Sequence, residues 1–127
     1  QRGLTLGVFQ KAKEQGVTVF TRSAFLQGLL MMKEEEIPRY VEGIKPYIAE
    51  FNQLLDKYHL ERKHVILKYI LSQNLIDYMV FGVETKEQLV GIIEERYTES
   101  LSAEVIDEIQ NYFCDIDVKL ILPIHWR

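Results

Sequence analysis

The chain has neither the cysteine pairs of a disulfide-stabilised protein nor the long apolar run of a membrane-spanning one. Its 127 residues contain one cysteine, Cys114, which excludes an internal disulfide framework and suits a reducing compartment. No apolar run reaches the roughly 18 residues that a transmembrane helix needs, and no secretory signal is present. We therefore expect a cytoplasmic protein without a membrane partner, and a buried, unreactive thiol at Cys114 because no basic residue adjoins it in sequence.

Positive charge is outnumbered by negative charge, with 15 Lys and Arg against 19 Asp and Glu. A net charge of −4 and a pI near 5.4 argue against nucleic acid or an anionic membrane surface as the main partner. The three histidines, His59, His64 and His125, lack the spacing of metal ligands, so no metal site is predicted. The acidic pairs and runs, including Glu94–Glu95, are expected to lie on solvated surfaces.

The length and composition indicate one small globular domain spanning residues 1–127. Hydrophobic residues make up 47% and charged residues 27%, as in ordinary soluble proteins. The first residue is Gln1 rather than methionine, so we expect the chain to begin inside a longer reading frame or after processing. Residues 114–127 form a mixed apolar segment that we expect to be extended and docked on the rest.

Two short strands alternate with helices in the predicted order of a parallel α/β sheet. Val17–Thr21 is rich in β-branched and aromatic residues, and Ile76–Phe81 is a second apolar run closed by Gly82. Apolar residues at helical spacing and helix-capping residues predict five helices, at about residues 5–15, 45–58, 62–73, 85–97 and 102–113.

The segment after each strand carries residues suited to binding an anion. Gly82 turns the chain into a helix whose first backbone N–H groups lack internal partners, and Thr85 with Gln88 forms a capping box. Thr85 and Gln88 are equally what a helix start favours with no ligand. After the first strand, Ser23 offers a hydroxyl and Gly28 allows close approach of the backbone, although Ser23 is also compatible with an ordinary loop.

These two segments resemble one known family. Arg22-Ser-Ala-Phe-Leu-Gln-Gly-Leu-Leu30 resembles the seventh-strand segment of aldo-keto reductases. Ile76-Asp-Tyr-Met-Val-Phe-Gly-Val-Glu-Thr-Lys-Glu-Gln-Leu89 resembles their eighth strand and the cofactor-binding turn that follows. The resemblance extends from roughly Gly3 to Phe113. It implies an α/β fold that is the C-terminal portion of a TIM (β/α)8 barrel, with two parallel strands and about five helices, and with residues 1–113 as barrel units. A whole barrel needs about 250 residues.

The resemblance also implies a cofactor, NADPH or NADH, and assigns it two groups of residues. The pyrophosphate and ribose would be wrapped by residues of the first loop: Ser23, Phe25, Gln27 and Gly28. The adenosine 2′-phosphate end would be held by the second turn: Gly82, Val83, Thr85 and Gln88, with Lys86 as an added positive charge. Family members often carry Glu and Asn where this chain has Gly91 and Ile92, which cannot make the usual bonds to adenine. The preference between NAD and NADP is therefore left open.

The family's catalytic groups are a tyrosine with a supporting lysine, aspartate and histidine, all in the N-terminal half of the barrel. None of their motifs occurs in this chain, and its seven tyrosines are expected in packing roles. No catalytic residue is predicted. The chain would be the cofactor-binding part of an oxidoreductase that reduces small aldehydes or ketones, and would be inactive alone.

A second hypothesis needs no cofactor. The chain would be a non-catalytic helical domain, derived from a barrel, that acts by packing or association. Under both hypotheses two strands outside a closed barrel leave sheet edges and an apolar face open. We therefore expect the isolated chain to self-associate. The identity of the substrate is not indicated by these residues.

Overall fold

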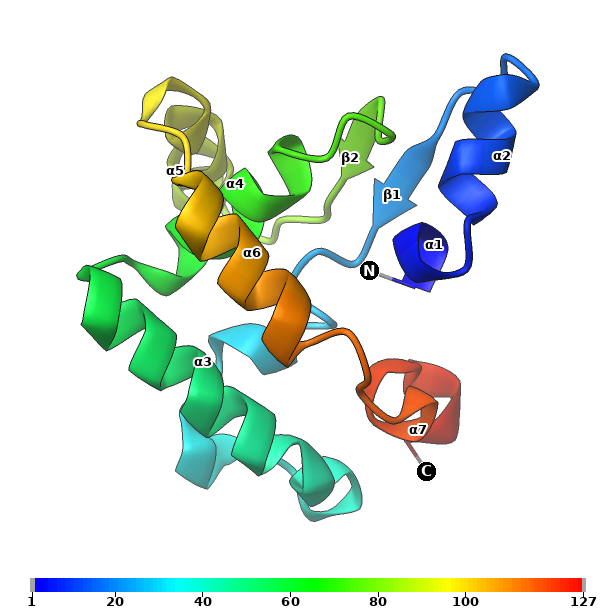
Figure 1. Ribbon diagram of the computed structural model, residues 1–127. Helices are drawn as coiled ribbons and strands as arrows, with labels where there is room; N and C mark the ends of the chain where they lie inside the picture. Colours follow the sequence, from blue (N-terminus) through cyan, green and yellow to red (C-terminus); the bar gives the residue numbers. More distant parts are fainter. Residues whose placement is uncertain (1, 127) are drawn as a thin grey trace.

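The computed structural model describes residues 2–126, and it shows a mixed α/β chain with an open sheet (Figure 1). The helices and strands of this part of the chain are, in order, α1 Arg2–Thr5, α2 Val8–Glu14, β1 Phe20–Arg22, α3 Lys45–Tyr58, α4 Arg62–Leu71, β2 Tyr78–Val80, α5 Lys86–Glu94, α6 Ala103–Tyr112 and α7 Val118–Ile121. Each of the five predicted helices is present as one of α2 to α6. No helix formed by residues 2–126 is both long enough and apolar enough to cross a membrane.

The sheet consists of β1 and β2, which are neighbours and run parallel, as predicted. Phe20 pairs with Tyr78, Thr21 with Met79 and Arg22 with Val80. Both strands are shorter than predicted, with three residues each, and β1 ends at Arg22 instead of Thr21. The start of the pair is fixed by Asp77, whose carboxylate accepts the Val19 N–H at 2.7 Å and binds Lys13 of α2. The sheet is open and is not a closed barrel.

The larger core lies between α3, α4 and α6, which lie together in Figure 1. Apolar residues recur at helical spacing on all three, and the faces they form meet. Pro46 stands in the first turn of α3, where its missing N–H costs nothing, and His59 ends that helix in the left-handed conformation. The buried residues of this helical cluster are Phe51, Leu54, Leu55, Val65, Ile66, Leu101, Val105 and Ile109.

A smaller core lies under the segment between β1 and α3. Its buried residues are Leu29, Ile37, Val41, Ile44 and Ile48. Leu120 and Trp126 of the C-terminal tail pack against it, so the tail is docked. The expectation of an extended tail is wrong, because Asp117 accepts the Lys119 N–H at 2.8 Å and starts the short helix α7. A 3₁₀ turn, η5 (Pro123–His125), follows it.

Two expectations about exposure are also wrong. Cys114 is exposed, because it lies beyond the end of α6, where its thiol donates to the Asn111 carbonyl at 3.3 Å. Glu95 is buried, with 7% of its surface exposed, because it lies on the side of the 3₁₀ helix η4 (Glu95–Tyr97) that faces α4. The acidic run Glu34–Glu36 is exposed, as expected, and forms a 3₁₀ turn.

Candidate functional site

Both predicted cofactor loops begin at the same edge of the sheet. Because β1 and β2 are parallel and Arg22 lies opposite Val80, the residues that follow each strand leave the sheet side by side (Figure 1). One segment continues through Ser23 to Gly28, and the other through Gly82 to Gln88. Within residues 2–126 no hydrogen bond or ion pair joins the two segments, so their relation is set by the sheet.

The loop from Ser23 to Gly28 has a strained backbone. Ser23, Leu26 and Gln27 have φ values of 61°, 49° and 55°, and Gly28 has 86°. Only glycine adopts this left-handed region freely, and each other residue held there costs about 1–3 kcal/mol. Such a run persists only where surrounding contacts enforce it, and strained segments of this kind gather at binding and active sites.

The contacts that enforce this loop come from its own backbone and from both cores. Leu26 N–H donates to the Ser23 carbonyl at 2.9 Å, and Leu30 N–H to the Phe25 carbonyl at 3.2 Å. The Phe25 ring packs on the helical cluster, and Leu29 is fully buried in the smaller core. The ring of Phe25 is therefore partly buried against this core.

The remaining predicted residues of this loop face solvent. The side chains of Ser23 and Gln27 are exposed, and a Cβ placed on Gly28 would meet no atom within 4 Å. A ligand approaching the loop would therefore meet a hydroxyl, an amide and an open stretch of backbone. These are groups that bind phosphate and ribose oxygens by hydrogen bonding.

The second turn is closed by its own side chains. Thr85 is the N-cap of α5, and its hydroxyl accepts the Gln88 N–H at 3.2 Å, as predicted. In a capping box the Gln88 side chain would accept the N–H of Thr85. Here Gln88 Oε1 accepts the N–H of Glu84 instead, at 2.8 Å. Gly82, Val83 and Lys86 are exposed on this turn. Gln88 thus shapes the turn through its backbone N–H and its side-chain oxygen.

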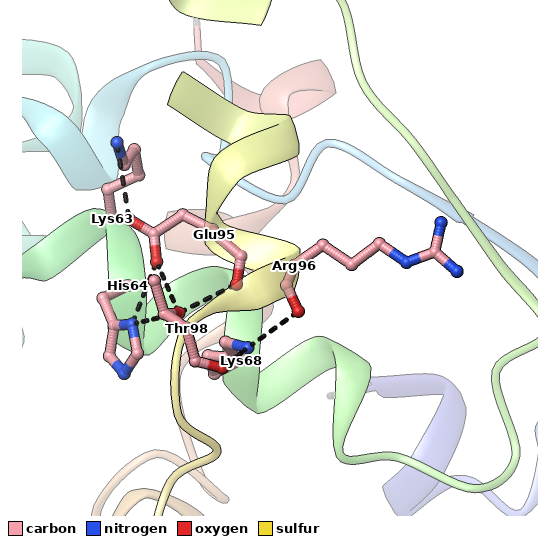
Figure 2. A network of polar contacts seen from close by, with 6 residues as sticks. All are labelled: Lys63, His64, Lys68, Glu95, Arg96 and Thr98. Atoms are coloured by element: carbon pink, nitrogen blue, oxygen red, sulfur yellow. Dashed lines mark hydrogen bonds and ion pairs between the residues drawn. The ribbon is translucent and has the colours of Figure 1, made fainter. Parts of the chain in front are cut away.

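Helix α5 carries this turn, yet none of its residues is buried. It is held instead at its far end, where η4 meets α4 in a network of polar contacts (Figure 2). Glu95 binds Lys63 at 3.4 Å and His64 Nδ1 at 2.9 Å. Thr98 Oγ1 lies 3.2 Å from both Glu95 Oε2 and His64 Nδ1. The network therefore fixes the end of α5 and, through the helix, the direction of the turn.

Glu95 keeps its negative charge within this network although it is buried. Burial alone would raise the pKa of Glu95, but hydrogen bonds from His64, Lys63 and Thr98 outweigh it and hold the pKa below its ordinary value of 4.5. Lys68 is buried as well, and its ammonium donates to the carbonyls of Thr98 at 2.6 Å and Arg96 at 3.5 Å. Glu95 thus stays a carboxylate where α4 meets η4.

Sequence reasoning missed these residues, although one signal points to them. Lys68 interrupts the apolar run from Val65 to Leu71, and a lone charge on a buried helix face requires partners. Beside the network lies an open hollow of about 280 Å³, lined by His59, Leu60, Glu61, His64, Glu95 and Thr98. It includes none of the nine predicted cofactor residues. Across residues 2–126 no three His, Cys, Asp or Glu side chains are grouped so that they could hold a metal.

Comparison of the chain with models of known protein families finds no match, and neither does comparison with curated proteins. A function for this chain must therefore be argued from its own residues. The two segments at the carboxyl edge of the sheet offer the strongest argument, since both expose polar groups and the first has a strained backbone.

Proposed function

We propose that this chain is the C-terminal part of an NAD(P)H-dependent aldo-keto reductase, and that its two loops bind the adenosine side of the cofactor. The observation that supports this most is the parallel pairing of β1 with β2, which delivers both loops to one edge. In (β/α)8 barrels the active site lies at the carboxyl ends of the strands, and the loops after the last two strands often bind phosphate. The resemblance of both segments to that family points the same way.

The residues present fit a dinucleotide. Ser23 and Gln27 would donate to pyrophosphate and ribose oxygens, and the open space above Gly28 would let the chain approach them. The Thr85 hydroxyl takes the Gln88 N–H, which leaves the N–H groups of Lys86 and Glu87 at the positive end of the helix dipole, where the Lys86 side chain is exposed. Both features favour a phosphate group.

The position that often carries Glu in the family is filled differently. Gly91 lies against Lys63, whose ammonium would be 3.2 Å from a Cβ placed there. Where family members often have a carboxylate that bonds adenine, this chain has a glycine without a side chain, next to Lys63 of the polar network. This difference leaves the preference between NADH and NADPH to be measured.

When bound, the cofactor supplies a hydride to the carbonyl carbon of an aldehyde or ketone. In this proposal the residues of this chain bind and orient the adenosine end, and none of them donates the proton. The chain alone would have no reductase activity, and the small carbonyl substrate would be bound by residues outside it.

Titration of the 127-residue chain with NADPH and NADH, followed by calorimetry, tests the proposal. Saturable binding is expected, and Ser23→Ala and Lys86→Ala should each raise the dissociation constant several-fold. Ser100→Ala and Lys119→Ala, at exposed positions outside both loops, are the matched controls and should leave it unchanged. Absence of saturable binding would sink the proposal. Equal competition by inorganic phosphate would indicate an anion site without selectivity for nicotinamide dinucleotides.

One observation favours the second hypothesis, a domain that acts by association. Phe20 and Tyr78 stack with ring centroids 4.9 Å apart, and both rings are largely exposed, as is Val80. Self-association through this face predicts that Phe20→Asp lowers the sedimentation coefficient at high concentration, whereas Tyr97→Asp, at an exposed tyrosine of η4, does not. Association without nucleotide binding would favour this hypothesis over the first.

A further inference from the structure

The Arg62 side chain, at the start of α4, joins three parts of the molecule. Its Nη1 donates to the carbonyls of Leu30 at 2.9 Å and Met32 at 3.3 Å, and its Nη2 donates to Asn52 of α3. The guanidinium carbon lies 5.8 Å from the centre of the Phe51 ring. The side chain is partly buried, and burial lowers the pKa of Arg62. Partial burial of a charge is costly unless hydrogen bonds compensate for it, so we ask which segments these bonds hold.

The carbonyls that Arg62 holds belong to the segment directly after the strained loop. Gly28 is the N-cap of the 3₁₀ helix η1 (Leu29–Met31), and the chain leaves that helix at Met32. A helix end leaves carbonyls without partners, and Arg62 supplies donors for two of them. The loop is therefore fixed on one side by β1 and on the other by Arg62.

We propose that Arg62 is a positioning residue that holds the loop from Ser23 to Gly28 in its left-handed shape and thereby in the shape that binds the cofactor. The ligand in this inference rests on the proposed function, whereas the effect on the loop does not. Arg62 itself touches the segment behind the loop and need not touch the cofactor.

An arginine suits this task better than a lysine. The guanidinium is a rigid plane whose N–H groups point along fixed directions, so one group bonds two carbonyls and Asn52 while it lies over the Phe51 ring. An ammonium is a point charge on a flexible stem and would satisfy fewer of these acceptors. In sequence, Glu61-Arg62-Lys63 is typical of a solvated helix start, so the task is visible only in the structure.

The test compares Arg62→Met and Arg62→Lys with Arg96→Met in the full chain. Arg96 is a matched control because its guanidinium points away from the polar network and only its carbonyl takes part (Figure 2). Hydrogen exchange is measured at the amides of Leu26, Leu29 and Leu30, together with the dissociation constant for NADPH. Arg62→Met should speed exchange at these amides at least tenfold and raise the dissociation constant at least tenfold, with Arg62→Lys intermediate and Arg96→Met unchanged.

Each outcome decides the inference. Unchanged loop exchange in either folded Arg62 variant overturns it, and so does exchange that rises equally throughout α3 and α6, which would indicate global destabilisation. A loosened loop with an unchanged dissociation constant overturns the link to binding. If the unsubstituted chain binds no NADPH, the proposed function fails along with that link, while loop exchange still decides whether Arg62 positions the loop. If Arg62→Met does not fold, Arg62→Lys carries the same comparison.

Discussion

Apolar side chains are buried in the helical part of the molecule and exposed on its sheet. In the helical cluster Leu54 and Val105 are each 2% exposed and Val65 is 1% exposed. On the sheet Phe20 is 63% exposed, Tyr78 58% and Val80 51%. The helices α3, α4 and α6 close a core among themselves, whereas two strands with three residues each have open edges and an open apolar face. Folding is thus driven by the helices, and the sheet is where the molecule can accept further contacts.

The two candidate loops differ in the same way: the first packs on buried apolar residues and the second does not. The loop after β1 returns into the helical part, because Phe25 packs on the helical cluster and Leu29 is buried in the smaller core. The turn after β2 stays on the open side, since no residue of α5 is buried and the helix is fixed by the polar network around Glu95. The first loop is held by packing together with the hydrogen bonds of Arg62, and the second by the network around Glu95, so the two should respond to different substitutions.

The largest expected effect comes from opening a cavity in the helical part. Leu54→Ala should lower the free energy of unfolding by about 2–5 kcal/mol, because the neighbours of a fully buried leucine cannot close the space. Val80→Ala, which removes exposed surface from the sheet, should cost less than about 1 kcal/mol. Urea denaturation followed by circular dichroism measures both. Equal losses would show that the sheet face is covered in solution and would break the comparison.

The next effect concerns the polar network. Glu95→Gln should cost about 1–3 kcal/mol, because it removes a buried carboxylate from Lys63 and His64 and leaves their donors without a charged acceptor. Glu94→Gln, at the exposed neighbouring residue, is the matched control and should change the free energy of unfolding by no more than about 0.5 kcal/mol. Similar values for the two variants would mean that the network does not hold α5.

Acidification should weaken the same network. The pKa of Glu95 is lower in the folded chain than its ordinary value of 4.5, so its contribution is complete above that value and is lost as pH falls through the folded pKa. The free energy of unfolding should therefore decline below about pH 5. Glu95→Gln should show a shallower decline over that range than the unsubstituted chain. Parallel declines would assign the acid sensitivity to other carboxylates, such as Glu108, whose pKa is lowered by Lys57 and Tyr58.

These contrasts explain which features the sequence predicts. Short-range patterns are sufficient for the helices: Pro46, Ser102 and the helical spacing of apolar residues place α3 and α6 nearly as observed. They also indicate two strands in parallel order, because each apolar run is followed by a turn and a helix. The same patterns place the nine predicted residues after the two strands, whereas their assignment to a cofactor came from the family resemblance.

The features that escaped prediction depend on contacts between distant residues. Glu95 is indistinguishable from Glu94 in sequence, and only the approach of η4 to α4 buries it beside His64. Arg62 lies 30 residues or more from the carbonyls it binds. The left-handed values at Leu26 and Gln27 likewise contradict local preference and exist because packing enforces them.

The smallest expected effect is local and lies at the start of the sheet. Asp77 accepts the Val19 N–H and pairs with Lys13, and these two contacts hold its pKa below the ordinary value of 3.8. Asp77→Asn removes the charge and replaces one of the two carboxylate oxygens with an NH2 group. The remaining oxygen can accept the Val19 N–H or bind Lys13, but not both as the carboxylate does. We expect faster hydrogen exchange at Val19 and unchanged exchange within α3 and α6, because the helical core does not depend on the strands. Exchange that rises in the helices as well would show that the sheet and the helical core unfold as one unit. The two regions would then differ in the exposure of their apolar side chains but not in stability.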